Sequence, residues 1–504
     1  MKLNYKRTIL VGFAFFLISA FWGAYDAIVP LALTNHFGLP QTVSGVIMSV
    51  DNVLAVFMLP IFGAISDKVM TRFGKRTPFV VIGTVAAALS FVLLTVVNGL
   101  QINALAESGV IDTYNAAAEV FKTTTEGLKE ALKSGAITES AYTTAMVEAD
   151  AVFTAVKDSL KEEALSITLS NAWPLVGFIG VLLVVLIAMA TFRSPAVALM
   201  PDVTVKPLRS KGNAIINLMG TAGGIIILLF SAIFGISDDP YMSYTGYVLA
   251  TAGVMIAGLA VFMLTVKEKK WAEEMENTTR ELGLEDNAPE TDDQPKRVLD
   301  RAELKSLILI LASVALWYIG YNSITSKYSV YSIDVLGVNY GLTLIVAQAA
   351  AIVSYIPVGI IASKLGRRKT ILAGITMLTT AFFIGNFIGA GTNTLVMYPI
   401  FALAGIGWAT INVNSFPMVV ELAKGGEVGK YTGYYYTASM AAQIVAPILS
   451  GVLYDAFGMR AMFFSFGTVF VALSFVTMFF VKHGDARPEN VPGSALEMLA
   501  GGDD

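Results

Sequence analysis

The chain has 504 residues, of which 55% are hydrophobic and only 14% are charged. This leaves too few polar residues to cover the surface of a soluble protein, so we predict a protein that crosses a membrane several times. The formal net charge of -4 gives no reason to expect a nucleic-acid partner, and the lack of cysteine excludes disulfides and thiolate chemistry.

Apolar runs long enough to cross a bilayer, about 20 residues each, recur along the chain. The first follows Lys2, Lys6 and Arg7 and is too long for a signal-peptide core, so we expect it to remain as the first span. The runs predict twelve spans, at about residues 8–34, 43–66, 77–99, 173–200, 213–236, 243–266, 304–326, 341–363, 371–390, 395–421, 431–454 and 460–481.

Lysine and arginine cluster in alternate turns between the predicted spans. Because positive residues accumulate in short cytoplasmic loops, these turns should face the cytoplasm. An even number of spans then places both termini there too, in a multi-pass protein of the plasma membrane. The positive turns contain Lys68, Arg72, Lys75, Arg76, Lys206, Arg209, Lys211, Lys364, Arg367, Arg368 and Lys369.

The spans divide into two predicted halves of six helices, residues 1–266 and 304–482. A cytoplasmic linker, 267–303, is rich in charge and contains prolines, so we expect it to be partly disordered. Residues 483–504 would form a cytoplasmic tail.

Residues 100–172, between the third and fourth spans, form an acidic segment on the predicted outer side, with eleven acids against five lysines. Their Ala, Glu, Lys and Thr content, with a break at Ser134 and Gly135, predicts a helical hairpin at about 115–133 and 138–166. The segment is either an external cap or docking module, or a tolerated insertion in an outer loop. The lack of a polar motif favours the insertion, and we expect transport without it.

A short charged turn after the second span is partly repeated about three hundred residues later, which suggests two parallel halves. The second copy has Ser363 where the first has Asp67. We predict that these turns form a cytoplasmic gate whose ion pairs break and re-form; the alternative is that the charges only set the topology. The predicted gate residues are Gly63, Asp67, Arg72, Gly74, Arg76, Asp202, Arg209 and Arg367.

Ionisable residues within spans are costly, roughly 2.5–3.5 kcal/mol on the insertion scale, and are candidates for function. Asp26 lies in the first span, Asp51 in the second and Arg193 in the fourth. Because both histidines lie near span ends, a carboxylate is the predicted proton carrier, with Arg193 as its partner. The alternatives are a purely structural pair with Arg193 and a position at a helix end nearer to water.

Neutral polar and aromatic residues at mid-depth suggest a substrate rich in hydroxyl groups, such as a sugar. An anionic substrate would require several buried cations. Only Arg193 is clearly inside the spans, because Lys327 is expected at the outer mouth. For each aromatic residue, ordinary helix packing is the alternative. The predicted substrate-binding residues are Asn52, Tyr321, Asn322, Trp408, Asn412 and Gln443.

The loop from Gly63 to Arg76 resembles that of the major facilitator superfamily. Within that superfamily, the loop is similar to that of sucrose carriers and of the glycoside-pentoside-hexuronide cation symporters. The similar residues are Ser66-Asp67-Lys68 and, after them, Arg72-Phe73-Gly74-Lys75-Arg76-Thr77-Pro78-Phe79. The resemblance implies an all-α membrane protein with the major facilitator fold, twelve transmembrane helices in two six-helix halves. The helical extracellular insertion between helices 3 and 4 is foreign to this pattern.

The resemblance also implies proton symport of a neutral sugar, a di- or oligosaccharide, by alternating access. Melibiose-type sodium symporters have two acids in the second helix, where this chain has Ala55 and Leu59, so sodium coupling is disfavoured.

We therefore predict a secondary active transporter whose partners are a small-molecule substrate, protons and the lipid bilayer, and which acts as a monomer. Two alternatives remain open: an exporter of drugs or other amphipathic molecules, because the chain has 20 methionines, and a membrane sensor or scaffold. The spans contain no nucleophile–base pair, metal cluster or phosphate loop, so the sequence predicts no enzyme, no cofactor and no metal.

Overall fold

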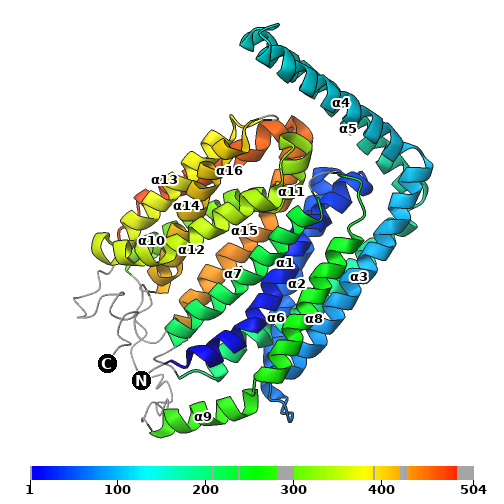
Figure 1. Cartoon of the computed structure of the whole chain (residues 1–504). Helices are drawn as coiled ribbons and strands as arrows, with labels where there is room; N and C mark the ends of the chain where they lie inside the picture. The colour runs from blue at the N-terminus through cyan, green and yellow to red at the C-terminus, as the bar shows by residue number, and fades with distance from the viewer. Residues whose placement is uncertain are drawn as a thin grey trace.

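The structure is a computed structural model, and it describes residues 3–205, 209–236, 239–281, 300–389, 392–420, 422 and 428–484. Within these ranges, twelve long helices form the main bundle (Figure 1). They are α1 (Tyr5–Leu31), α2 (Gln41–Lys68), α3 (Thr77–Glu107), α6 (Trp173–Asp202), α7 (Arg209–Ile233), α8 (Thr245–Thr265), α10 (Arg301–Thr325), α12 (Tyr340–Leu365), α13 (Arg367–Gly385), α14 (Thr394–Val420), α15 (Val428–Phe457) and α16 (Met459–Phe479).

Ten of these helices are long and apolar enough to cross a membrane, as judged over the described residues. The other two, α12 and α13, occupy the places of the predicted spans 341–363 and 371–390. In α13 the apolar length is short, because this 19-residue helix begins with Arg367, Arg368 and Lys369.

The two halves repeat the same packing. In the first half α3 packs against α6 and α8, and α1 packs against α8; in the second half α13 packs against α14 and α16, and α10 packs against α16. Each pair in the second half is the counterpart, in chain order, of a pair in the first. The parallel halves that the sequence suggests are therefore present in the fold.

Local sequence explains where several helices begin and end. Pro78 and Pro174 stand in the first turns of α3 and α6, where proline loses no hydrogen bond. Asp300 and Glu303 form a capping box at the start of α10. Gly366 (φ +91°) and Gly458 (φ +86°) separate α12 from α13 and α15 from α16, in a backbone conformation that favours glycine.

A helical hairpin extends from one end of the bundle beyond α3 (Figure 1). It consists of α4 (Val110–Lys133) and α5 (Glu139–Ser170). The predicted start near residue 115 is too late, because α3 continues to Glu107 and the turn falls at Gly109, which has a φ of +84°. We call this end of the bundle the hairpin side and the opposite end, which holds the turn between α2 and α3, the loop side.

The two halves meet at the hairpin side. A Cβ atom on Gly45 of α2 would overlap the carbonyl oxygen of Pro447 in α15, and one on Gly341 of α12 would overlap Ser231 of α7. Only glycine permits these close approaches between helices of different halves. A further contact joins α1 to the short helix α11 (Tyr328–Tyr331).

The predicted linker, 267–303, contains one helix, α9 (Glu268–Glu281), on the loop side (Figure 1). The rest of the linker, residues 282–299, lies outside the described residues, as does the predicted tail after residue 484.

Candidate functional site

A cavity of about 210 Å³ lies between the two halves. Five helices contribute to its wall: α1, α2 and α6 from the first half, and α10 and α15 from the second. The lining residues are Trp22, Tyr25, Asp26, Met48, Asp51, Asn52, Arg193, Asn322, Thr325, Ser326, Gln443 and Pro447.

The three residues predicted for proton coupling, Asp26, Asp51 and Arg193, all line this cavity. They come from α1, α2 and α6, so helix packing brings together residues that lie far apart in the sequence. The Asp51 carboxylate accepts a hydrogen bond of 2.7 Å from Nδ2 of Asn52. The Arg193 guanidinium lies over the ring of Trp22, 5.5 Å from its centroid, a geometry that stabilises a cation.

Three buried polar atoms in the cavity wall have no hydrogen-bond partner among the described residues: Nε1 of Trp22, the hydroxyl of Tyr25 and Oγ of Ser326. Buried donors are normally satisfied, because an unpaired one costs roughly 1–3 kcal/mol. The three atoms are covered in this conformation, so they would have to become exposed before they could bond to a polar molecule in the cavity.

Three of the six predicted substrate-binding residues, Asn52, Asn322 and Gln443, line the cavity. Asn322 and Gln443 each donate one hydrogen bond to their own helix, to the carbonyl oxygens of Tyr318 at 2.8 Å and Ser439 at 3.2 Å. Each side chain therefore keeps further hydrogen-bonding capacity for a ligand.

The other three predicted residues, Tyr321, Trp408 and Asn412, are absent from the described lining of the cavity. The rings of Tyr321 and Trp408 stack on each other, with centroids 3.7 Å apart and planes at 4°. For these two aromatic residues, the structure is consistent with helix packing.

Thr325 and Ser326 line the cavity but are missing from the prediction. They follow Asn322 by three and four positions, so they lie on the same helix face. That spacing is the signal that could have found them.

Lys327 lies at the hairpin side, where it is buried between the two halves. Its Nζ donates hydrogen bonds to Oγ of Ser44 at 2.6 Å and to the carbonyl oxygen of Gln41 at 3.4 Å, both in the first turn of α2. Near it, the Asp455 carboxylate of α15 accepts hydrogen bonds from the backbone N–H groups of Gln41 and Thr42, at 2.7 Å each. The first turn of α2 is therefore held by polar groups of the other half.

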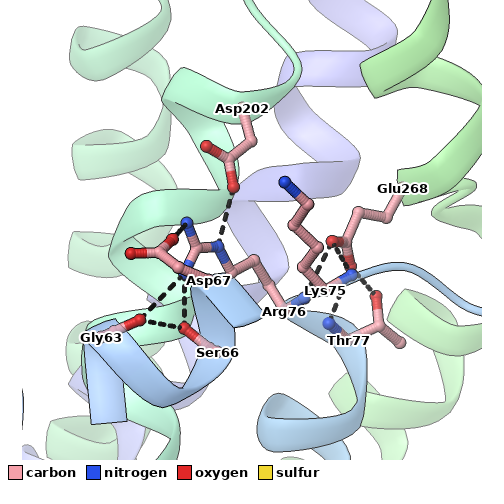
Figure 2. Close-up of polar contacts among 8 residues, drawn as sticks. All are labelled: Gly63, Ser66, Asp67, Lys75, Arg76, Thr77, Asp202 and Glu268. Carbon is pink, nitrogen blue, oxygen red and sulfur yellow. Dashed lines mark hydrogen bonds and ion pairs between the residues drawn. The ribbon is translucent and has the colours of Figure 1, made fainter. Parts of the chain in front are cut away.

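On the loop side, Arg76 is the centre of a polar network (Figure 2). Its guanidinium pairs with Asp67 of α2 and, at 2.7 Å, with Asp202 at the end of α6. It also donates to Oγ of Ser66 and to the carbonyl oxygen of Gly63, the latter at 3.4 Å. The network joins α2, α3 and α6 of one half.

Burial by itself lowers the pKa of Arg76, but the hydrogen bonds and charges of Asp202 and Asp67 outweigh it. The pKa of the guanidinium is therefore raised above its ordinary value, and Arg76 stays charged at any physiological pH.

Glu268, the first residue of α9, holds the turn that carries Arg76 (Figure 2). Its carboxylate accepts hydrogen bonds from the backbone N–H groups of Lys75, Arg76 and Thr77, at 2.6, 2.8 and 2.7 Å. The side chain is only 3% exposed. A carboxylate at the start of α3 also interacts favourably with the helix dipole.

Gly74 explains how Glu268 comes so close. It has a φ of +119°, and a Cβ atom there would overlap the Glu268 carboxyl group. The prediction includes Gly74 but misses Glu268, because a glutamate almost two hundred residues away has no local sequence signal.

Three further residues are predicted for the gate: Arg72, Arg209 and Arg367. The Arg72 guanidinium lies over the ring of Phe73, 4.6 Å from its centroid. Arg209 begins α7, but its side chain lies outside the described part of the structure. Arg367 begins α13 in the other half. In the described parts of the chain, no group of three or more His, Asp or Glu residues is placed to hold a metal ion.

A family model described as Major Facilitator Superfamily matches residues 164–424 and 340–498, which together cover about two thirds of the chain. The chain belongs to the major facilitator superfamily. A second model, described as MFS/sugar transport protein, matches residues 10–106. The protein is therefore a multi-pass membrane protein of this superfamily.

The matched curated relatives include the MFS-type transporter ppzB of Metarhizium rileyi, 29% identical over 126 residues, or 25% of this chain and 26% of the relative. An uncharacterized MFS-type transporter of Schizosaccharomyces pombe, C18.02, is 28% identical over 133 residues, or 26% of this chain and 28% of the relative. These matches span only about a quarter of each relative.

The fold is similar to that of several solved transporters. The inward-open xylose transporter XylE from E. coli matches over 99% of both chains with a TM-score of 0.56 and 13% identity. A D-xylose-proton symporter matches with a TM-score of 0.54 and 13% identity, over 95% of this chain and 99% of the other. A peptide transporter bound to alafosfalin has a TM-score of 0.58 and 12% identity, over 94% of this chain and 93% of the other. At these identities the similarity concerns the fold alone.

Proposed function

We propose that this protein is a proton-coupled symporter of a small neutral sugar, working by alternating access. The observation that carries the proposal is the composition of the central cavity. Two carboxylates, one guanidinium and three amides line the same cavity, together with Trp22, Tyr25 and Ser326. Such a set can donate to and accept from the hydroxyl groups of a sugar, while the aromatic rings can contact its apolar face.

The size of the cavity narrows the substrate class. Pockets for drug-sized ligands occupy roughly 300–1,000 Å³, and this cavity of about 210 Å³ lies below that range. A single sugar ring is therefore favoured in this state, whereas a disaccharide requires a wider cavity in another state. The sugar-transport model at residues 10–106 and the xylose carriers among the structural neighbours agree with this class.

Asp26 and Asp51 are the candidate proton carriers, because a carboxylate can gain and lose a proton whereas Arg193 remains charged. Moving one proton inward across 100 mV supplies about 2.3 kcal/mol. A tenfold higher concentration of a neutral substrate inside than outside requires about 1.4 kcal/mol. One proton per sugar therefore suffices for accumulation.

The loop side is the cytoplasmic side in this proposal, and the Arg76 network, which lies within the first half, borders the cytoplasmic gate. The halves are joined at the hairpin side by α2 with α15 and α7 with α12, so this conformation is closed toward the outside. Transport requires those contacts to open and contacts on the loop side to close around the same cavity.

The test is sugar-dependent proton movement in right-side-out vesicles that contain the protein. Adding xylose, glucose or sucrose one at a time should make the outside more alkaline for at least one sugar. Asp26→Asn or Asp51→Asn should abolish the response, while Asp112→Asn, an exposed acid of α4, should leave it unchanged. If both Asp26→Asn and Asp51→Asn keep the response, the proposed role of these two residues in proton coupling is contradicted.

An exporter of cationic amphipathic molecules is the second candidate. It is favoured by Trp22, Tyr25 and Met48 beside two carboxylates, since such surfaces bind aromatic cations. Proton-driven efflux of a cationic dye, with no alkalinisation on adding any sugar, would replace the sugar proposal by this one.

A further inference from the structure

The base of the hairpin is firmly attached to the first half. Gln101 of α3 donates a hydrogen bond of 2.9 Å to Oγ1 of Thr168 in α5, which donates to the carbonyl oxygen of Phe37 at 3.0 Å. A separate apolar cluster contains residues of α3, α4, α5 and the turn between α7 and α8: Leu105, Val110, Tyr114, Leu160, Ala164 and Tyr241. The hairpin therefore moves with the first half.

The same helix α5 also reaches the second half, and the contacts there are charged. Nζ of Lys161 lies 2.6 Å from Oδ2 of Asp334, and Nζ of Lys157 donates to the carbonyl oxygen of Asp334. Asp334 belongs to the π-helical turn Ser332–Leu336 that leads into α12. Further along the hairpin, Asp150 pairs at 2.7 Å with Arg460, in the first turn of α16.

One partner in each ion pair is largely shielded from water. The side chain of Asp334 is 9% exposed and that of Asp150 is 16% exposed, against 26% for Lys161 and 58% for Arg460. Such pairs are screened less by salt than fully exposed ones. They are nevertheless separable, because the apolar cluster at the base of the hairpin consists of residues of the hairpin and the first half.

We infer that the α4–α5 hairpin is a clamp that holds the two halves together on the hairpin side and so stabilises the conformation closed there. When the halves separate on that side, the pairs of Lys161 and Asp150 break while the base of the hairpin stays on the first half. The inference rests on the proposed alternation between two states. It differs from the insertion hypothesis, which expects no energetic link between hairpin and transport cycle.

The lack of cysteine in the chain allows a direct test. Cysteines replacing Asn171 and Leu395, exposed residues of the two halves on the hairpin side, would carry nitroxide labels in the full-length protein in lipid nanodiscs. Pulsed electron resonance then reports the distance between the labels, and with it the fraction of molecules open on this side.

Lys161→Gln and Arg460→Glu should each increase the ratio of open to closed molecules about twofold to fivefold, the range for one ion pair of modest strength. The double change Arg460→Glu with Asp150→Arg should restore the original distribution. Lys129→Gln removes a charge of the same sign from an exposed position of α4 and should change nothing.

An unchanged distance distribution in both single variants would overturn the clamp. So would an equal shift in Lys129→Gln, since that result would indicate a general effect of hairpin charge. The measurement needs no substrate, so it is independent of the sugar assay. A shift that is reversed by the double change supports the clamp even if no tested sugar moves protons.

Discussion

Asp26, Asp51 and Arg193 lie within apolar helices. Burying an ionisable group there is energetically unfavourable unless water or a partner group stabilises its charge. The structure places all three around one cavity. Residue type and depth were enough to select them. Which neutral residues join them was only half predictable, since Asn52, Asn322 and Gln443 line the cavity but Tyr321 and Trp408 stack on each other.

Tyr25→Phe tests whether the unpartnered hydroxyl of Tyr25 binds substrate. Losing one hydrogen bond to a neutral group costs about 0.5–1.5 kcal/mol, so the KM for the transported sugar should rise about twofold to tenfold. Tyr321→Phe is the matched control and should leave KM unchanged, because that residue lies outside the described lining of the cavity. Equal effects of the two changes would contradict the assignment.

Glu268→Gln tests the support of the loop-side turn. The variant keeps an acceptor oxygen but loses the charge that strengthens three backbone hydrogen bonds. We expect a loss of stability of about 1–2 kcal/mol, measured as a lower midpoint of thermal unfolding in detergent. Glu273→Gln, at an exposed position of the same helix, should have no measurable effect; a similar loss there would show that the effect is not specific to the turn.

At the scale of helices, the crossing of α2 and α15 depends on glycine. Gly45 and Gly451 each face the backbone of the opposite helix so closely that a Cβ atom would overlap it. The first turn of α2 is also capped by Asp455. Because these contacts join the two halves, the packing of this pair decides whether the hairpin side is closed.

Gly45→Ala should therefore favour separation of the halves on the hairpin side, since the added methyl group clashes with Pro447. Labels at positions 171 and 395 should show a larger open fraction, and transport should slow if closure becomes rate-limiting. Gly253→Ala is the matched control, because a Cβ there meets no heavy atom within 4 Å. A normal distance distribution in Gly45→Ala would contradict the role of this crossing.

At the scale of the whole molecule, the two halves form one helical bundle with the α4–α5 hairpin at one end and the turn between α2 and α3 at the other (Figure 1). The predicted orientation, with the positive turns in the cytoplasm, follows from the distribution of lysine and arginine. This orientation places the hairpin outside the cell and the turn between α2 and α3 inside it.

Single cysteines at Lys129 of the hairpin and at Lys68 of the loop side test the orientation. A membrane-impermeant maleimide added to intact cells should label the cysteine at 129, and should label the one at 68 only after the membrane is permeabilised. The unmodified chain, which has no cysteine, is the background control. The opposite pattern would reverse the proposed sidedness and place the Arg76 network beside an external gate.

The positions of the long helices could be predicted from the sequence because membrane insertion depends on local apolar length and on where charges interrupt it. The hairpin could also be predicted, apart from its start, since the turn at Gly109 leaves only a weak local signal. Hydropathy does not determine how a helix is rotated about its axis, because the faces toward lipid and toward other helices are both apolar.

The sequence alone therefore determined the spans, the two halves, the hairpin and the ionisable residues that needed an explanation. Only the tertiary structure decided which of them meet: Asp26 with Asp51 and Arg193, Glu268 with the turn before α3, and Lys161 with Asp334. The physical reason is that burial and charge are properties of single segments, whereas a site between helices depends on their rotation and crossing.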